Sequence, residues 1–139
     1  MTYIDPTAEM ITRLAADAET IRGPIRMINL LKFNDIADYG DQPDPSETGS
    51  PSTGAEAYAR YGANTIGELA RVGGTIFYAA AADMNVIGPD DEAWDQVAIV
   101  EYPSREKFLT MVAKPSYQAA VFHRTAGLAD TRLIMTSGW

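Results

Sequence analysis

The order in which helical and strand patterns follow one another constrains this chain of 139 residues more than any other feature. Segments rich in β-branched and large apolar residues predict strands at residues 25–33, 75–82, 94–102 and 131–136. Apolar residues at helical spacing predict helices at residues 53–73 and at 103–127, the latter interrupted at Pro115. A further helix, beginning at Asp5-Pro6 and ending before Gly23-Pro24, precedes them. After that first helix, the predicted order is β, α, β, β, α, β.

This order is that of the ferredoxin-like fold, an α+β arrangement in which an antiparallel sheet carries its helices on one face. We therefore expect an N-terminal helix within residues 1–23 and one ferredoxin-like domain over residues 24–139, with an acidic loop at 34–53. A chain of this length buries enough apolar surface to hold a core without a metal ion or a disulfide. Because it has no cysteine, disulfides, thiolate metal sites and cysteine nucleophiles are excluded.

Two of the predicted strands are apolar on both faces. Apolar residues occupy odd and even positions alike in residues 25–33, and residues 94–102 show the same pattern. An antiparallel sheet with one face in water would alternate apolar and polar residues. Since the helices cover only one face, we expect a second copy of the chain to cover the other face in a homodimer.

The formal charge of −8 is concentrated in two blocks. Residues 34–56 hold six acids, residues 72–104 hold another six, and neither block contains a base. In the ferredoxin-like order both blocks lie largely at one end of the sheet, which predicts a negative pole there. Nucleic acids and anionic membranes bind clustered Lys and Arg, so we expect neither as a partner. A ligand is expected to be neutral or cationic, or to enter away from this pole.

The acidic loop at 34–53 is rich in Asp, Pro, Gly and Ser. It is either a lid over a site or a solvated segment held open by its own charge. Its acids recur every third residue, which is not the spacing of a calcium loop. The chain shows neither a signal peptide nor a membrane-length apolar run, so a cytoplasmic protein is expected.

The segment from residue 94 to residue 124 resembles a known family. A strand ends in Glu101-Tyr102-Pro103-Ser104, the helical region after it carries Pro115-Ser116-Tyr117-Gln118, and Arg124 lies downstream. These residues are similar to those of the bacterial family named domain of unknown function 1330, of the dimeric α/β-barrel superfamily, over roughly residues 24–136. The resemblance implies a face-to-face dimer that forms an α/β barrel. It does not specify an activity, because this superfamily includes cofactor-free oxygenases, isomerases, haem enzymes and binding modules.

Two residues are candidates for catalysis. His123, the one histidine of the chain, is either a base near neutral pH or a structural histidine at the edge of the core. Asn29 is polar within an apolar strand, so its amide either bonds a partner in the core or points at a ligand or oxyanion. Arg124 is a candidate for ligand binding, and it either clamps a substrate carboxylate or pairs with Glu101 or another acid.

Four further residues are candidates for ligand binding. Tyr61 and Tyr78 are expected to line the space between the sheet and the helix that begins at Thr53, or simply to fill the core. Trp94 is a packing residue or a ligand contact, and Asp95 is either a turn residue or the partner of His123. We expect no metal site, because with a single histidine a multi-histidine site can arise only across subunits.

Two functions remain open from the sequence. The first is an enzyme without a bound cofactor, of the oxygenase or isomerase type suggested by the resemblance, acting on a small phenolic or lactone-like molecule. The second is a non-catalytic module for a small ligand or a protein. A haem protein with His123 as the axial ligand is a third, weaker possibility.

Overall fold

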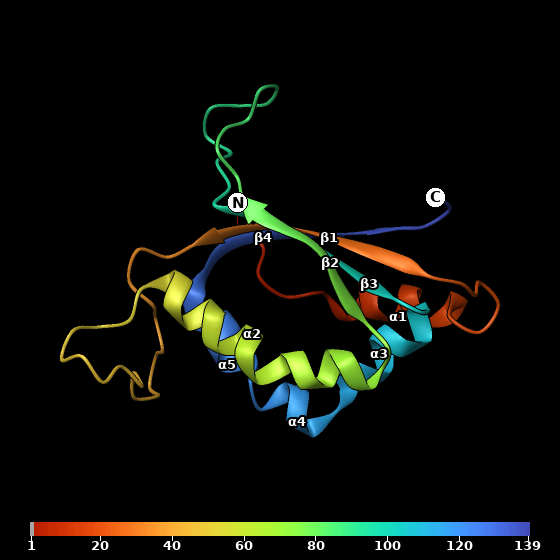
Figure 1. Cartoon of the computed structure of the whole chain (residues 1–139), viewed down its shortest axis with the longest axis horizontal. Coiled ribbons are helices and arrows are strands. Elements are labelled where there is room, and N and C mark those ends of the chain that lie inside the picture. The colour runs from red at the N-terminus through yellow and green to blue at the C-terminus, as the bar shows by residue number, and fades with distance from the viewer. Residues whose placement is uncertain (1) are drawn as a thin grey trace.

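The computed structural model describes residues 2–139 and confirms the ferredoxin-like order. Its elements are α1 (Ala8–Asp17), β1 (Ile25–Phe33), α2 (Gly54–Arg71), β2 (Thr75–Ala81), β3 (Gln96–Tyr102), α3 (Arg105–Ala113), α4 (Pro115–Gln118), α5 (Val121–Gly127) and β4 (Leu128–Thr136). The four strands form one sheet in the order β2-β3-β1-β4, and each neighbouring pair is antiparallel. Helices α2 to α5 lie together on one side of this sheet (Figure 1).

The first helix is shorter than the sequence predicts. It begins at Ala8, where the Thr7 hydroxyl accepts a hydrogen bond from the Met10 N–H, and it ends at Asp17 rather than near Gly23. Asp5 does not cap this helix, because its carboxylate is paired with Arg124 of α5. Before the helix, Tyr3 bonds the sheet, because its carbonyl accepts a hydrogen bond from the Thr131 N–H of β4.

The two faces of the sheet have different environments. Odd-numbered residues of β1 point toward the helices, and Ile25, Met27 and Leu31 are buried there with Tyr102 of β3. Even-numbered residues of β1 point to the opposite side, which we call the open face. No helix covers the open face (Figure 1). The core of the described chain therefore lies between the sheet and the helices.

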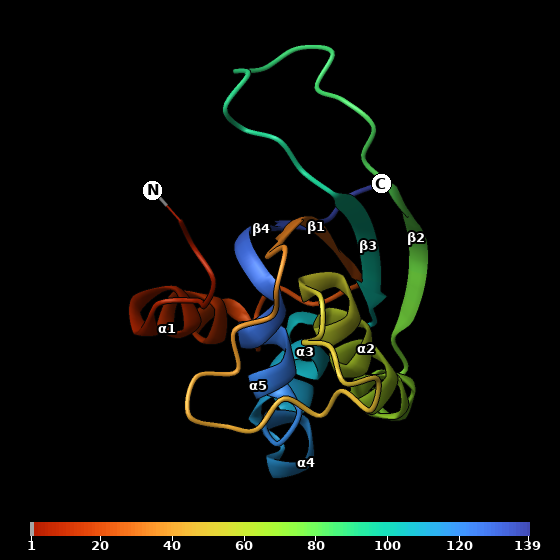
Figure 2. The same ribbon diagram turned by 90° about the vertical axis from the view of Figure 1, so that its left-hand side faces the viewer.

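Both acidic blocks leave the same end of the sheet, but they diverge. The acidic loop at 34–53 turns over the helical layer, whereas the connection between β2 and β3, residues 82–95, extends away from the helices (Figures 1 and 2). We call this second connection the arm. The predicted negative pole is therefore divided between two opposite sides of the molecule.

A close backbone contact between α2 and α5 positions the acidic loop. A Cβ atom on Gly127 would lie 2.5 Å from the Gly54 carbonyl oxygen, and a Cβ atom on Gly54 would meet the Asn34 and Gly127 backbones. Asn34 links the two helices, because its N–H donates to the Gly127 carbonyl at 2.8 Å and its own carbonyl accepts from the Gly54 N–H at 3.0 Å. The loop thus starts and ends at one junction.

Glycine at residue 127 is therefore required by packing, unlike glycine at Gly62 in the middle of α2. A Cβ atom at Gly62 would meet nothing within 4 Å. We expect Gly127→Ala to lower the free energy of unfolding by about 1–3 kcal/mol through overpacking. Gly62→Ala should raise it by about 0.5–1 kcal/mol, because alanine is the better helix former. Urea unfolding of the two variants measures both effects, and a Gly127→Ala variant as stable as the wild type would contradict the required contact.

Candidate functional site

The acidic loop is folded onto the helical layer rather than held open. Its one aromatic residue, Tyr39, is buried against Ala57 of α2 and Ala126 of α5. The Asp38 N–H donates to the Ala126 carbonyl at 2.9 Å, which fixes the backbone beside Tyr39. The loop is therefore anchored where α2 and α5 meet.

The far part of the loop is closed by Asp44. Its carboxylate accepts hydrogen bonds from the hydroxyl and the N–H of Ser52, at 2.7 and 2.8 Å. These bonds, the hydroxyl's first, lower the pKa of Asp44 below its usual value. The expectation of a segment extended by self-repulsion is therefore wrong for this loop.

Tyr39 joins a chain of three side chains. Its Oη lies 2.8 Å from Nδ1 of His123, and Nη1 of Arg60 donates to the same Oη at 3.0 Å. A guanidinium can only donate, so the tyrosine oxygen accepts from Arg60. With the imidazole proton on Nε2, the Tyr39 hydroxyl donates its own proton to Nδ1, and we assign this tautomer to His123. In this tautomer the histidine is neutral. We call these three residues the relay.

The surroundings of His123 favour this neutral form. Its side chain is buried, and the Phe122 ring stacks on the imidazole at 4.0 Å between centroids. Burial, and secondly the positive charge of Arg60, lower the pKa of His123 below its usual value. The imidazole is therefore available as a base at neutral pH.

A cavity of about 770 Å³ opens to solvent beside the relay, and we call it the groove. Residues of α5 and of the turn into β4 line one part of it, and the acidic loop and the N-terminal segment line the rest. The lining residues are Ile4, Asn34, Asp38, Tyr39, Gly40, Gln118, Val121, Phe122, Thr125, Leu128 and Ala129. Tyr39 belongs to both the relay and the groove, so it connects the buried histidine with the groove.

Arg124 lies next to this groove, because Val121, Thr125 and Leu128 on either side of it are lining residues. Its guanidinium is mostly buried and bonds the Asp5 carboxylate at 3.2 Å. Glu101, the other partner considered from the sequence, pairs instead with Arg26 at 2.9 Å. Arg124 thus has a structural partner in the N-terminal segment.

Asn29 and Tyr61 are both partly buried, and neither lines the groove. The side-chain amide of Asn29 donates to the carbonyls of Met27 and Ala98, both at 3.3 Å. The amide of Asn29 therefore has partners in its own strand and in β3. The Tyr61 hydroxyl is 2.6 Å from that of Tyr117, and burial raises the pKa of Tyr61. The structure therefore does not bring Asn29 or Tyr61 to His123.

Tyr78 lies on the open face, not between the sheet and α2. The register of β2 shifts between Ile76 and Tyr78, so Ile76 pairs with Val100 on the helical face while Tyr78 pairs with Ile99 on the open face. An extra residue in one strand turns the following side chains to the other side of the sheet. The predicted common space for Tyr61 and Tyr78 is therefore wrong.

Asp95 is a turn residue and not the partner of His123. Its carboxylate accepts the Phe33 N–H at 2.7 Å, and its own N–H donates to the Leu31 carbonyl at 2.7 Å. These bonds join the base of the arm to the end of β1. The alternative in which Asp95 orients the histidine is thus excluded by geometry.

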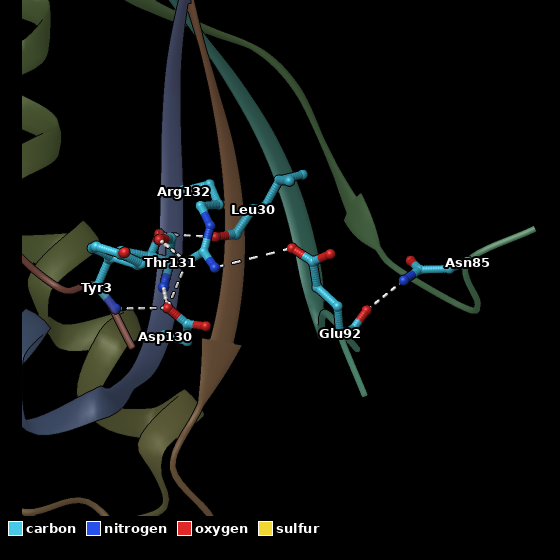
Figure 3. Close-up of polar contacts among 7 residues, drawn as sticks. All are labelled: Tyr3, Leu30, Asn85, Glu92, Asp130, Thr131 and Arg132. Carbon is cyan, nitrogen blue, oxygen red and sulfur yellow. Dashed lines mark hydrogen bonds and ion pairs between the residues drawn. The ribbon is translucent and has the colours of Figure 1, made fainter. Parts of the chain in front are cut away.

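Trp94 lies at the base of the arm, with the Arg132 guanidinium 5.2 Å from the centre of its ring. Arg132 is also paired with Asp130 at 2.7 Å and with Glu92 of the arm at 4.0 Å (Figure 3). The same Asp130 carboxylate accepts the Tyr3 N–H at 2.8 Å (Figure 3). Trp94 therefore belongs to a cluster that joins the arm, β4 and the N-terminal segment.

Tyr39 and Arg60 are the functional candidates that the sequence does not identify. Arg60 is one of several polar residues on the outer side of a predicted helix, and Tyr39 lies in a loop with a polar composition. The one available signal is that Tyr39 is the only aromatic residue among residues 34–53. An aromatic side chain in such a loop is a candidate anchor, since burying it stabilises the folded loop.

Two kinds of feature are absent from residues 2–139. In this part of the chain, no three acidic or histidine side chains come together as metal ligands would. None of its helices combines the length and the apolar composition needed to cross a bilayer.

Comparison with known proteins identifies a family but no activity. The family model of the domain of unknown function DUF1330 matches residues 51–139, a later start than the resemblance suggests. No curated protein matches the chain. The RPA0582 protein of unknown function from Rhodopseudomonas palustris is 38% identical, with a TM-score of 0.88 over 100% of this chain and 98% of that one.

More distant structures share the fold alone. A Bacteroides fragilis protein described as dimeric, of unknown function and ferredoxin-like fold, is 14% identical, with a TM-score of 0.50 over 84% of this chain and 98% of that one. A candidate antibiotic biosynthesis monooxygenase from Caulobacter crescentus is 12% identical, with a TM-score of 0.51 over 90% of this chain and 98% of that one. These similarities confirm the ferredoxin-like fold.

The charge of Arg60 can be tested through the titration of His123. Arg60→Gln keeps a donor for the Tyr39 hydroxyl but removes the positive charge that disfavours the imidazolium. We therefore expect the pKa of His123 to rise in this variant. Arg71→Gln, at the far end of α2, should leave it unchanged. NMR titration of the single imidazole measures both, and a pKa that falls or stays constant in Arg60→Gln would contradict the electrostatic role of Arg60.

Proposed function

The chain belongs to the DUF1330 family, and we propose that it is a cofactor-independent enzyme that moves protons on a small organic molecule bound in the groove. The observation that carries this proposal is the relay, in which a buried imidazole is hydrogen-bonded to Tyr39, a residue that also lines the groove. Such an arrangement suits isomerisation by proton transfer. It equally suits the deprotonation that precedes cofactor-free oxygenation of a phenol-like substrate.

The relay can act as a base without ionising Tyr39 for long. A substrate proton moves to the oxygen of Tyr39 while the hydroxyl proton of Tyr39 moves to Nδ1 of His123, so that the net acceptor is His123. The positive charge of Arg60, 3.0 Å from that oxygen, stabilises negative charge on it during transfer. The burial and charge that lower the pKa of His123 also make its protonated form a good acid, which returns the proton to the substrate.

The groove indicates the class of ligand. Its volume lies within the usual range for small-molecule sites, and Val121, Phe122 and Leu128 give it apolar surface. Asp38 lies at its edge, and Asp35 and Asp41 belong to the same loop. A neutral or cationic ring compound with one acidic hydrogen fits this combination better than an anion does.

A ligand-binding module without turnover is the second candidate. It is favoured by the openness of the groove, which does not exclude water as enzymes commonly do during proton transfer. It predicts saturable binding of the same class of ligand with no chemical change. Native mass spectrometry of the purified protein would identify a ligand that remains bound.

Proton transfer can be measured before the physiological substrate is known. The wild type is incubated in D₂O with phenols, lactones and 1,3-dicarbonyl compounds, and NMR follows deuterium incorporation while an electrode follows oxygen consumption. We expect Tyr39→Phe and His123→Gln each to lower the rate on an accepted compound roughly 100-fold or more, as loss of a general base does. Tyr61→Phe removes a tyrosine hydroxyl outside the groove and should change the rate little. Equal rates in the wild type and both relay variants would refute the proposal, and binding without exchange would favour the module.

We further propose that the protein is a homodimer packed through its open face. Phe77, Tyr78, Ile134 and Trp139 lie there with about half of each residue exposed. Arg26 lies between two of these rings, 3.9 Å from the centre of Phe77 and 4.0 Å from that of Trp139. Covering these side chains with a second copy would bury a continuous apolar surface. The description of the Bacteroides fragilis neighbour as dimeric agrees with this proposal.

Two isoleucines of similar exposure allow a matched test of this interface. Ile134 is 48% exposed on the open face, and Ile66 is 50% exposed on α2. Light scattering at micromolar concentration should give twice the 15.1 kDa of one chain for the wild type and for Ile66→Asp. Ile134→Asp should give a monomer, because the interface would bury an unpaired charge. A monomeric wild type would overturn the dimer, and a dimeric Ile134→Asp would move the interface away from this face.

A further inference from the structure

No residue of the arm, residues 82–95, belongs to the hydrophobic core of the described chain. Its base is closed by the Ala82 N–H, which donates to the Asp95 carbonyl at 3.0 Å, and the Asn85 side chain bonds the Glu92 carbonyl across it. From there it extends away from the helices and past the open face, as both views of the fold show (Figures 1 and 2). The direction of the arm is thus toward the side on which no part of the described chain lies.

The tip of the arm is the most exposed apolar segment of the described chain. Met84, Val86 and Ile87 are 77%, 86% and 96% exposed, whereas the next large apolar residue, Ile36, is 63% exposed. Contiguous apolar residues of this exposure are typical of an interaction surface. The folded chain in isolation gives these three residues nothing to pack against.

We propose that the arm of each protomer packs against a second copy of the chain. The apolar tip of the arm then contacts the outer side of the partner. This inference rests on the proposed dimer and assigns it a second contact, distinct from the open face. Each chain has one arm and one open face on the same side. When each arm contacts the other protomer, both arm contacts are made within two copies of the chain, as expected for a symmetric dimer.

The arm is long enough to reach along a second copy of the chain packed on the open face. The six residues from Ala82 to Ile87 reach roughly 20 Å when extended, at roughly 3.3 Å per residue. Two sheets packed face to face lie only about 10 Å apart. A partner on the open face would therefore have its sheet beside the middle of the arm and its helical layer beside the tip.

The charge of the arm disfavours other partners. Asp83, Asp90, Asp91 and Glu92 flank the tip, and the arm contains no base. Nucleic acid and anionic lipid would be repelled by these carboxylates. The chain outside the two acidic blocks has an excess of bases, so a second copy offers surface of the complementary sign.

The attachment of the arm supports a fixed direction rather than a free loop. Arg132 of β4 pairs with Glu92 near the base of the arm, and the Asp95 carboxylate bonds β1 on its other side (Figure 3 shows the Arg132 pair). A preformed arm loses less conformational freedom on binding than a disordered one. The arm can therefore contribute to affinity as well as to specificity.

Absence of cysteine makes a direct test possible. Val86→Cys provides one thiol at the tip, which is labelled with a photoactivatable maleimide. Equal amounts of ¹⁴N and ¹⁵N protein are mixed, illuminated and digested, so that mass spectrometry distinguishes links between chains from links within one chain. We expect links between chains, from the tip to the edge strands or helices of the partner. Links found only within one chain would overturn the proposal.

The contribution of the tip to the affinity of the dimer is tested by replacing its three apolar side chains together. Met84→Ser, Val86→Ser and Ile87→Ser in one variant should raise the dissociation constant of the dimer roughly tenfold or more. Ile36→Ser, which replaces an exposed isoleucine in the acidic loop, is the control and should leave the dissociation constant unchanged.

If Ile134→Asp dissociates the dimer but the triple variant does not, the arm proposal fails while the dimer stands. If the wild type is monomeric, both fail. Binding to phosphatidylcholine vesicles that the triple variant loses would assign the arm to a lipid surface and overturn the proposal.

Discussion

The contact between the backbones of Gly54 and Gly127 is the constraint on which the site depends. It brings the start of α2 against the end of α5 at a distance that no side chain would allow. Asn34 fills the remaining space and bonds both helices, and its side chain donates to the carbonyls of Ala126 and Leu128. A loop of about twenty residues is thereby closed at one point. Bringing the ends of this loop together costs conformational entropy, and the hydrogen bonds of Asn34 and the burial of Tyr39 offset that cost.

Closure of the loop has a chemical consequence. Tyr39 enters the space between α2 and α5, where Arg60 and His123 are already placed by their helices. Arg60 donates to the Tyr39 oxygen, and with the imidazole proton on Nε2 the Tyr39 hydroxyl donates to Nδ1. Tyr39 is thereby bonded to the imidazole, and it is also one of the residues that line the groove. The candidate site thus depends on the loop, α2 and α5 together. The family model, which begins at residue 51, does not include the loop half of it.

The sequence predicts the order of elements because that order depends on local patterns. The capping box of Thr53 and Glu56, for example, is present at the start of α2. Predictions fail where a contact between residues far apart in the sequence determines the local structure. Asp5 does not cap a helix because Arg124, 119 residues away, takes its carboxylate. Tyr78 lies on the unexpected face because of a register shift in β2, which alternation cannot reveal. The relay could not be predicted at all, since its three members come from a loop and two helices that only the folded chain brings together.

The protonation state of His123 tests the relay most directly. Because the chain has one histidine, the ¹⁵N signals of its imidazole can be assigned without ambiguity. At a pH where the ring is neutral, the relay requires the proton on Nε2 and an unprotonated Nδ1 that accepts the Tyr39 hydroxyl. A ¹⁵N-correlated spectrum with the proton on Nε2 would support this arrangement. A proton on Nδ1, or an imidazole whose pKa lies above its usual value, would contradict it.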